Sequence, residues 1–337
     1  MLTPRFVTVT MATAMVTASL VLVDARQVKS PPGGVLAEPV VNSGGPIYAA
    51  FEGYGPLKDG RIALLLGYFN RNRTQVVDIP IGPDNSIEPG GPDYGQPTHF
   101  LTGRQHGMFA IVVPKDFGTK KLTWTINANG HKNVVTFWAN PPYWVDFYKN
   151  TANGNEPPRI KFLIAGPEYM GPPVEKTVAT LSATVGQPLD LTAWAADQPA
   201  TVTFETGAEP AAPAPRPAAG AKPASEPLPA FIGGRVVNAS PAAAGGGGAA
   251  AAAAARRGDI QVIWKKYRGP GDVKIGTETI NLETGGDPKK FVEAKTTATF
   301  SAPGTYWLRA QVNDASGNGG GGDQCCWTSA HIVVNVK

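Results

Sequence analysis

Residues 122–137 read Leu-Thr-Trp-Thr-Ile-Asn-Ala-Asn-Gly-His-Lys-Asn-Val-Val-Thr-Phe, and no other stretch indicates the fold class as clearly. Apolar and polar residues alternate on both sides of Asn129-Gly130, the dipeptide that best accommodates the positive φ angles of a type I′ turn. We therefore predict a hairpin with a two-residue loop and expect Trp124 to be a core residue rather than a ligand platform. The predicted pairs are Leu122 with Phe137, Trp124 with Val135, Ile126 with Asn133 and, on the other face, Thr123 with Thr136.

Composition extends this pattern to the whole chain. Of 337 residues, 40 are Gly and 32 are Pro, which disfavours long helices because both residues destabilise a helix interior. An apolar content of 42% is sufficient to bury a core. Short apolar runs alternate with turn signals, and the run from Arg61 to Phe69 is apolar on both faces, as expected for a central strand. The sequence predicts an all-β fold of two β-sandwich-like domains, the first spanning residues 43–142.

The first 25 residues have the three-part layout of a secretory signal peptide. An Arg at position 5 precedes an apolar stretch over residues 6–23, and Val23-Asp24-Ala25 places small residues at the positions that a signal peptidase reads. An uncleaved membrane anchor is the alternative, although five hydroxyl residues make a poor bilayer helix. We expect a secreted or periplasmic protein whose mature chain begins with a flexible lead-in over residues 26–42 and has no membrane span.

After a Pro-rich linker over residues 143–175, the chain resembles an immunoglobulin-like sandwich of the PKD type found in secreted bacterial proteins. The resemblance rests on Leu189–Trp194 as a B-like strand, on Trp264 in a C-like strand, and on Phe300–Asp314. Tyr306 follows Pro303-Gly304 and fits a tyrosine corner. The resemblance implies a fold for residues 176–337 and no activity.

Alternation within this second domain predicts which side chains point inward, and it places His331 on the outer face. The residues expected to point inward are Tyr306, Leu308, Ala310, Val312, Ala330, Ile332, Val334 and Val336. Residues 207–257 are rich in Ala, Gly and Pro, and we expect this insert to be disordered because it offers little apolar surface to bury.

The two cysteines, Cys325 and Cys326, are adjacent. Consecutive Cα atoms lie about 3.8 Å apart, closer than in most disulfides, so a bridge between them is strained. It would close no chain loop and therefore provide no loop-entropy stabilisation. Three interpretations stay open: a vicinal disulfide, free or intermolecular thiols, and a redox or soft-metal site. For a metal site, the two cysteines and His331 would supply three ligands, and no fourth is evident in the sequence.

Function is indicated only in outline. The chain contains no nucleophile elbow, zinc-protease, phosphate-loop or Cys-x-x-Cys motif. A net charge of +4 without a basic run does not favour nucleic acid as a partner. We predict no catalytic, cofactor-binding or metal-binding residues. The oxygen-bearing side chains of the loop over residues 82–97 fit turns better than a calcium loop; they are Asp84, Asn85, Glu88 and Asp93.

The candidate contact surface is aromatic: Trp138, Tyr143, Trp144 and Trp327. Exposed aromatic residues stack on sugars or anchor protein partners, whereas packing between domains is their alternative use. We predict a non-catalytic binding or envelope-associated protein whose partner is a polysaccharide or a cell-envelope protein.

The alternatives are a carbohydrate-active enzyme or accessory subunit, and a redox- or metal-responsive protein that uses the two cysteines. An exposed face formed by Trp138, Tyr143 and Trp144 would favour carbohydrate binding. An inward-facing group of His99, Arg104 and His106 beside carboxylates would favour an enzyme.

Overall fold

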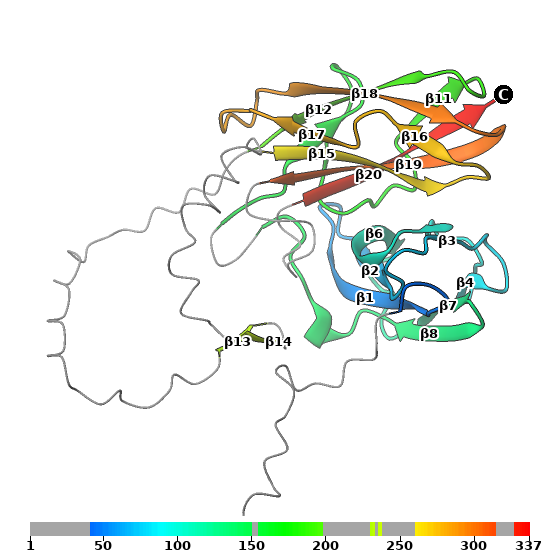
Figure 1. Cartoon of the computed structure of the whole chain (residues 1–337). Coiled ribbons are helices and arrows are strands. Elements are labelled where there is room, and N and C mark those ends of the chain that lie inside the picture. The colour runs from blue at the N-terminus through cyan, green and yellow to red at the C-terminus, as the bar shows by residue number, and fades with distance from the viewer. Residues whose placement is uncertain (1–40, 150–153, 198–229, 233–234, 238–259, 315–326) are drawn as a thin grey trace, which may run out of the picture. The chain divides into compact units, whose positions relative to one another are not determined.

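A computed structural model describes residues 41–149, 154–197, 230–232, 235–237, 260–314 and 327–337 (Figure 1). The predicted signal peptide, nearly all of the lead-in, Cys325, Cys326 and most of the insert lie outside these ranges. The described part of the chain is all-β, as the sequence predicts, and its only regular helical element is the 3-10 turn η2 (Pro141–Tyr143). Within it, no helix has the length and apolar character that crossing a bilayer requires.

The strands belong to two strand-rich groups. The first contains β1 (Ile47–Pro56), β2 (Ile62–Asn70), β3 (Val77–Asp78), β4 (Asn85–Glu88), β5 (His99–Phe100), β6 (Gly103–Val113), β7 (Leu122–Ala128) and β8 (His131–Phe137). The second contains β9 (Arg159–Lys161), β10 (Tyr169–Met170), β11 (Ala179–Ala183), β12 (Leu189–Ala196), β15 (Ile260–Arg268), β16 (Val273–Ile275), β17 (Thr279–Leu282), β18 (Val292–Phe300), β19 (Gly304–Asp314) and β20 (Trp327–Val336). Between β12 and β15, only the hairpin of β13 (Ala230–Ile232) and β14 (Arg235–Val237) is described.

In the first group, two three-stranded sheets enclose a core. Their orders are β1-β2-β6 and β4-β7-β8, and β3 pairs with β5 in a separate ladder. The strand predicted to be central, β2, is indeed the middle strand of its sheet. The β7–β8 hairpin has the predicted register, with Leu122 opposite Phe137, and Asn129 and Gly130 have φ angles of 53° and 80°. Trp124 is completely buried, which confirms its prediction as a core residue.

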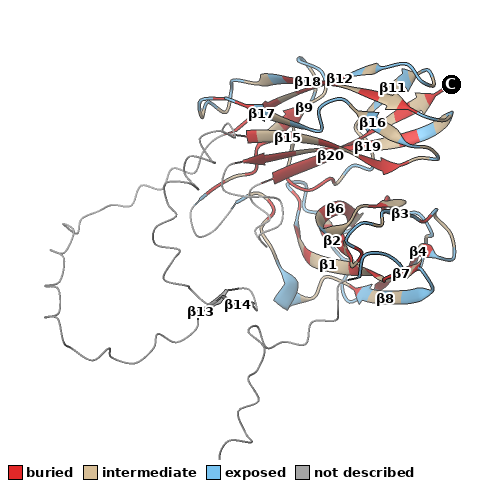
Figure 2. Cartoon of the chain, in the orientation of Figure 1, coloured by how far each residue is buried: buried red, intermediate tan, exposed pale blue. Residues whose placement is uncertain are grey.

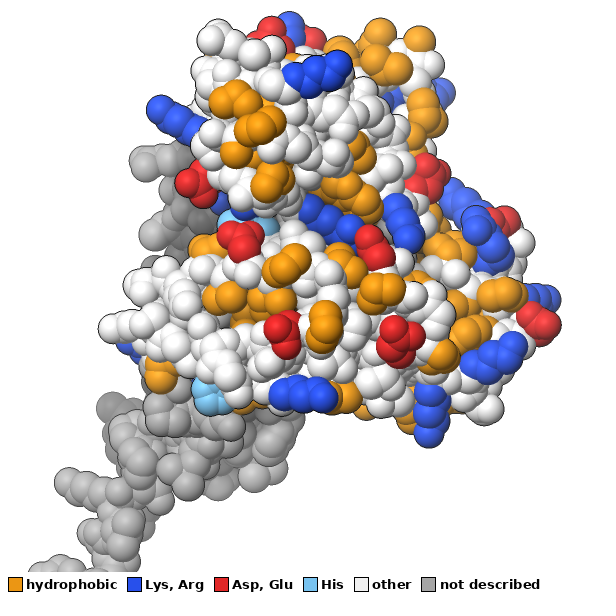
Figure 3. Space-filling view, turned by 90° about the vertical axis from the view of Figure 1, so that its right-hand side faces the viewer, with side chains coloured by type: hydrophobic (Ala, Val, Ile, Leu, Met, Phe, Trp, Pro, Cys, Tyr) orange, Lys and Arg blue, Asp and Glu red, His pale blue; other side chains and the backbone are white. Residues whose placement is uncertain are grey.

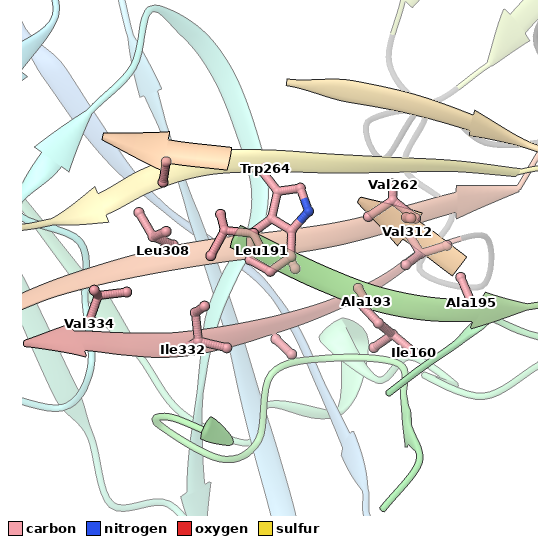
Figure 4. Close-up of a cluster of buried hydrophobic side chains, with 14 of the residues drawn as sticks. Ile160, Leu191, Ala193, Ala195, Val262, Trp264, Leu308, Val312, Ile332 and Val334 are labelled. Atoms are coloured by element: carbon pink, nitrogen blue, oxygen red, sulfur yellow. The ribbon is translucent and has the colours of Figure 1, made fainter. Parts of the chain in front are cut away.

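In the second group, two five-stranded sheets pack face to face. The orders are β10-β9-β12-β18-β16 and β11-β20-β19-β15-β17. Figure 4 shows side chains from both sheets pointing toward one another around Trp264. All eight residues predicted to point inward on β19 and β20 are buried, and Figure 2 shows β15, β19 and β20 buried along most of their length.

The segment predicted as a linker contributes to this sandwich. β9 extends one sheet by pairing with the C-terminal half of β12, and β10 pairs with β9. Phe147, within the same segment, is 1% exposed and packs in a small cluster with Leu57 and Trp327. Residues 143–175 are therefore partly built into the folded body rather than serving only as a connector.

His331 points away from the sandwich core, as predicted, but it is buried, at 1% exposed. Its side chain leaves the sandwich core as alternation requires, but the outer face of the sheet is covered by the first group of strands. The His331 ring lies 4.1 Å from the ring of Tyr267, centroid to centroid. Burial and the nearby charges of Arg309 and Arg268 lower the pKa of His331 to about 3.

The two groups of strands form one compact unit, Val40–Lys337. Arg268 makes a bidentate ion pair with Asp93, both N–O distances being 2.9 Å, and Tyr267 donates its hydroxyl to the carbonyl of Gly95 at 2.6 Å. Arg309 donates to the carbonyl of His106 at 3.0 Å. Figure 3 shows basic and acidic side chains next to one another on one face of this unit. Charge-assisted hydrogen bonds, together with aromatic packing, therefore join the two groups.

Candidate functional site

The aromatic residues after β8 surround a cavity of about 410 Å³. This volume falls within the range of small-molecule sites, about 300–1,000 Å³. The lining combines aromatic rings with two polar side chains: Phe51, Val135, Thr136, Phe137, Trp138, Asn140 and Tyr143. A ligand in this cavity would meet apolar ring surfaces together with the hydrogen-bonding groups of Thr136 and Asn140.

Local sequence places these rings. Trp138 follows the last residue of β8, and Pro141-Pro142 starts the 3-10 turn that turns the chain so that Tyr143 comes back over β1. The ring of Phe51 lies 5.6 Å from that of Phe137 and 5.5 Å from that of Tyr143, centroid to centroid. These distances are typical of attractive aromatic pairs. Tyr143 is nevertheless 51% exposed, so its ring is accessible to a ligand.

Two of the four predicted contact residues line this cavity, and the other two do not. Trp144 is 53% exposed, but its backbone forms a bridge with Tyr54 and its side chain is not part of the lining. Trp327 is only 2% exposed and packs against Gly107, where an added Cβ atom would lie 1.8 Å from the indole. It is therefore a packing residue, because β6 covers the start of β20.

Of the five lining residues that the sequence prediction did not name as contact residues, Phe51 is the most distant in the chain from Trp138 and Tyr143. It lies in the middle of β1, about ninety positions before Tyr143 in the chain, and nothing near it in the sequence distinguishes it from other strand aromatics. The only sequence evidence for Phe51 is the period-two alternation of β1. This alternation predicts the side of the strand on which the ring lies but does not identify the residues that it contacts.

The polar residues that would favour an enzyme are split between two places. Arg104 and His106 lie beside Glu52, at 2.5 Å and 3.2 Å from the same carboxylate oxygen. His99 instead lies 2.7 Å from Asp78. The three residues therefore do not form the single group that would favour an enzyme.

Glu52 stabilises the backbone of β6 through a hydrogen bond. Its side chain is 3% exposed, and its second oxygen accepts the backbone N–H of Gly107 at 2.6 Å. Arg104 also donates to the carbonyl of Tyr68. With its carboxylate occupied by these donors, this cluster supports the β6 backbone next to Trp327 and leaves no carboxylate oxygen directed into the aromatic cavity.

Comparison with known proteins does not assign the chain to a family. No protein-family model matches the chain, and no curated protein is similar to it. Function is therefore argued from the chain's own geometry.

The oxygen-bearing side chains of the loop over residues 82–97 stabilise the fold through hydrogen bonds and an ion pair. Asn85 is buried, donates to the carbonyls of Ile79 and Pro97, and accepts a hydrogen bond from the indole N–H of Trp124. Asp93 is paired with Arg268. Among the described residues, no group of three His, Cys, Asp or Glu side chains is placed to hold a metal ion.

Two further cavities differ from the aromatic one in lining. A cavity of about 270 Å³ lies between the β1–β2 turn and residues 168–175, where Lys58, Asp59, Arg61 and Glu168 bring charges of both signs. A third, of about 440 Å³, opens beside β12 and is mainly apolar, with Trp264 and Phe162 in its wall together with Thr180, Thr192 and Asp190. Of these three cavities, only the aromatic one has no charged residue in its lining and a wall ring that is more than half exposed.

Proposed function

We propose that the protein is a secreted or periplasmic, non-catalytic binding protein that recognises polysaccharide through the aromatic cavity. The observation that carries this proposal is the convergence of Phe51, Trp138 and Tyr143, together with the completely buried Phe137, on one cavity whose polar side chains are Thr136 and Asn140. A pyranose ring has an apolar C–H face and a polar edge of hydroxyls. It therefore needs an aromatic surface together with hydrogen-bonding side chains.

The half-exposed state of Tyr143 supports a binding role. Contact between two parts of one chain buries aromatic rings, as it does for Trp327 and Tyr267, whereas Tyr143 remains 51% exposed. Exposed aromatic residues around a cavity are typical of recognition surfaces. The next residue, Trp144, is also more than half exposed, at 53%, although it does not line the cavity.

The second group of strands serves this function as a support of the immunoglobulin type. The sheet orders place β12 and β18 in one sheet and β15, β19 and β20 in the other, as B and E lie against C, F and G in that fold. Tyr306 donates its hydroxyl to the carbonyl of Ala302 at 2.8 Å, the bond expected of a tyrosine corner. PKD-type modules resemble this arrangement.

Binding of the mature protein to a panel of envelope and plant polysaccharides tests the proposal. We expect saturable binding that Tyr143→Ala weakens about tenfold or more, because a ring at the centre of a contact contributes at least 1.4 kcal/mol. The control is Ile164→Ala, an apolar side chain 60% exposed on the other strand group. Absence of saturable binding across the panel, or equal losses from both variants, would refute the proposed site.

A further inference from the structure

We infer that the polysaccharide recognised by this cavity is acidic, carrying carboxylate groups on its sugar rings. The inference rests on the proposed function and specifies the ligand of the same cavity. Its basis is the charge next to the aromatic wall. Lys121 holds its ammonium 4.7 Å from the centre of the Trp138 ring.

The position of Lys121 follows from the hairpin register. Leu122 pairs with Phe137, so the residues just outside this pair, Lys121 and Trp138, are also neighbours across the two strands. Trp138 is one of the residues that line the cavity, whereas Lys121 lies next to it outside the lining. The attraction between the ammonium and the indole ring holds the charge against Trp138, a lining residue, instead of leaving it free in solvent.

No carboxylate competes for this ammonium from the cavity lining. None of the seven lining residues is acidic. Between Asp116 and Asp146 the sequence contains no Asp or Glu, but it does contain Lys120, Lys121 and Lys132. An anionic sugar in the cavity would therefore meet no acidic lining residue, and an exposed ammonium attracts a carboxylate without a large cost of desolvation.

Polygalacturonate and its fully methyl-esterified form provide a matched pair of ligands. The two share the sugar backbone and differ in charge, so stacking on Tyr143 is available to both. We expect the wild-type protein to bind the acidic form about threefold to fivefold more tightly at low salt, the upper part of the range for one exposed ion pair. The difference should decrease at physiological ionic strength, where the Debye length is about 8 Å rather than about 30 Å at 0.01 M.

Lys121→Gln should reduce affinity for polygalacturonate by the same threefold to fivefold and leave affinity for the methyl ester unchanged. The matched control is Lys290→Gln, which removes an exposed lysine from the turn before β18, on the other strand group. Tyr143→Ala should weaken binding of both forms.

The outcomes separate the two proposals. Equal wild-type affinity for the acidic and esterified forms would overturn the acidic preference while leaving polysaccharide binding intact. Equal losses from Lys121→Gln and Lys290→Gln would also overturn it, because attraction would then come from the net charge of +4. Binding of neither form, together with no binding across the wider panel, would overturn the proposed function itself.

Discussion

Burial changes the chemistry of His331. The imidazole is 1% exposed, lies against the ring of Tyr267 and has the guanidinium groups of Arg309 and Arg268 nearby. Because a charged imidazole would be both desolvated and repelled there, its pKa decreases to about 3. For the same reason, burial lowers the pKa of Arg309 to about 10.

Stability should therefore depend on pH through His331. The unfolded chain binds a proton at this residue below its ordinary pKa of about 6.5, and the folded protein does not until about pH 3. The stabilisation is complete above pH 6.5 and is lost as the pH falls. At about 1.4 kcal/mol per pH unit, urea unfolding should show a loss of about 2–3 kcal/mol between pH 6.5 and pH 4.5.

His331→Gln should reduce this slope, and His131→Gln, at an exposed hairpin position, should not. The pKa values of Asp78 and Asp93 are already lowered from 3.8 by His99 and Arg268, against the effect of their burial, so these carboxylates titrate below this window. An unchanged slope in His331→Gln would contradict the assignment.

The tyrosine corner shows how one side chain fixes the connection between two strands. Tyr306 is the third residue of β19, and its hydroxyl donates to the carbonyl of Ala302 in the turn after β18. The same oxygen accepts the backbone N–H of Gly271, in the turn after β15, at 3.0 Å. One hydroxyl therefore joins two turns at the same end of the sandwich, and the ring is completely buried.

Tyr306→Phe keeps the ring and removes both hydrogen bonds. It should lower the free energy of unfolding by about 1–3 kcal/mol, because the N–H of Gly271 loses its partner in a partly buried position. Thr305→Val is the matched control. It removes the hydroxyl of the adjacent residue, which donates a hydrogen bond to the side chain of Asn335 at an exposed position. Urea titration with an unchanged m value provides the measurement, and equal losses in both variants would contradict a special role for the corner.

The whole folded body is stabilised by contacts between its two groups of strands. Arg268 is the main polar link: it pairs with Asp93 through two hydrogen bonds and donates two more to the carbonyl of Gln96. Its guanidinium also lies 4.3 Å from the centre of the Trp307 ring. Its charge and hydrogen bonds lower the pKa of Asp93, although burial alone would raise it. The two groups should therefore unfold together.

Arg268→Met should uncouple them. We expect a loss of about 2–3 kcal/mol, less than for a fully buried pair because Asp93 is 44% exposed. Hydrogen exchange monitored by peptide mass should give one common opening free energy for β2 and β19 in the wild type and two different values in the variant. Arg61→Met, which breaks an exposed pair with Asp59, is the control. Common exchange in Arg268→Met would show that apolar packing alone couples the groups.

Sequence reasoning succeeded where neighbours in the chain are also neighbours in space. The β7–β8 hairpin, its register and the burial of Trp124 follow from Asn129-Gly130 and simple alternation. It placed Trp138 and Tyr143 together because only a short turn separates them. It failed for Phe51, because strand alternation does not identify the segment that a strand face will meet.

By itself, the sequence determined the all-β class, the inward faces of β19 and β20, and the corner at Tyr306, since period-two alternation and turn chemistry act over a few residues. Only the tertiary structure decided that Trp327 and His331 are buried, that β9 joins a sheet and that Phe51 completes the aromatic cavity. These features depend on which strand faces pack against one another. Burial of apolar surface is non-directional, so it stabilises any such contact, and the local sequence does not specify which segment will be the partner.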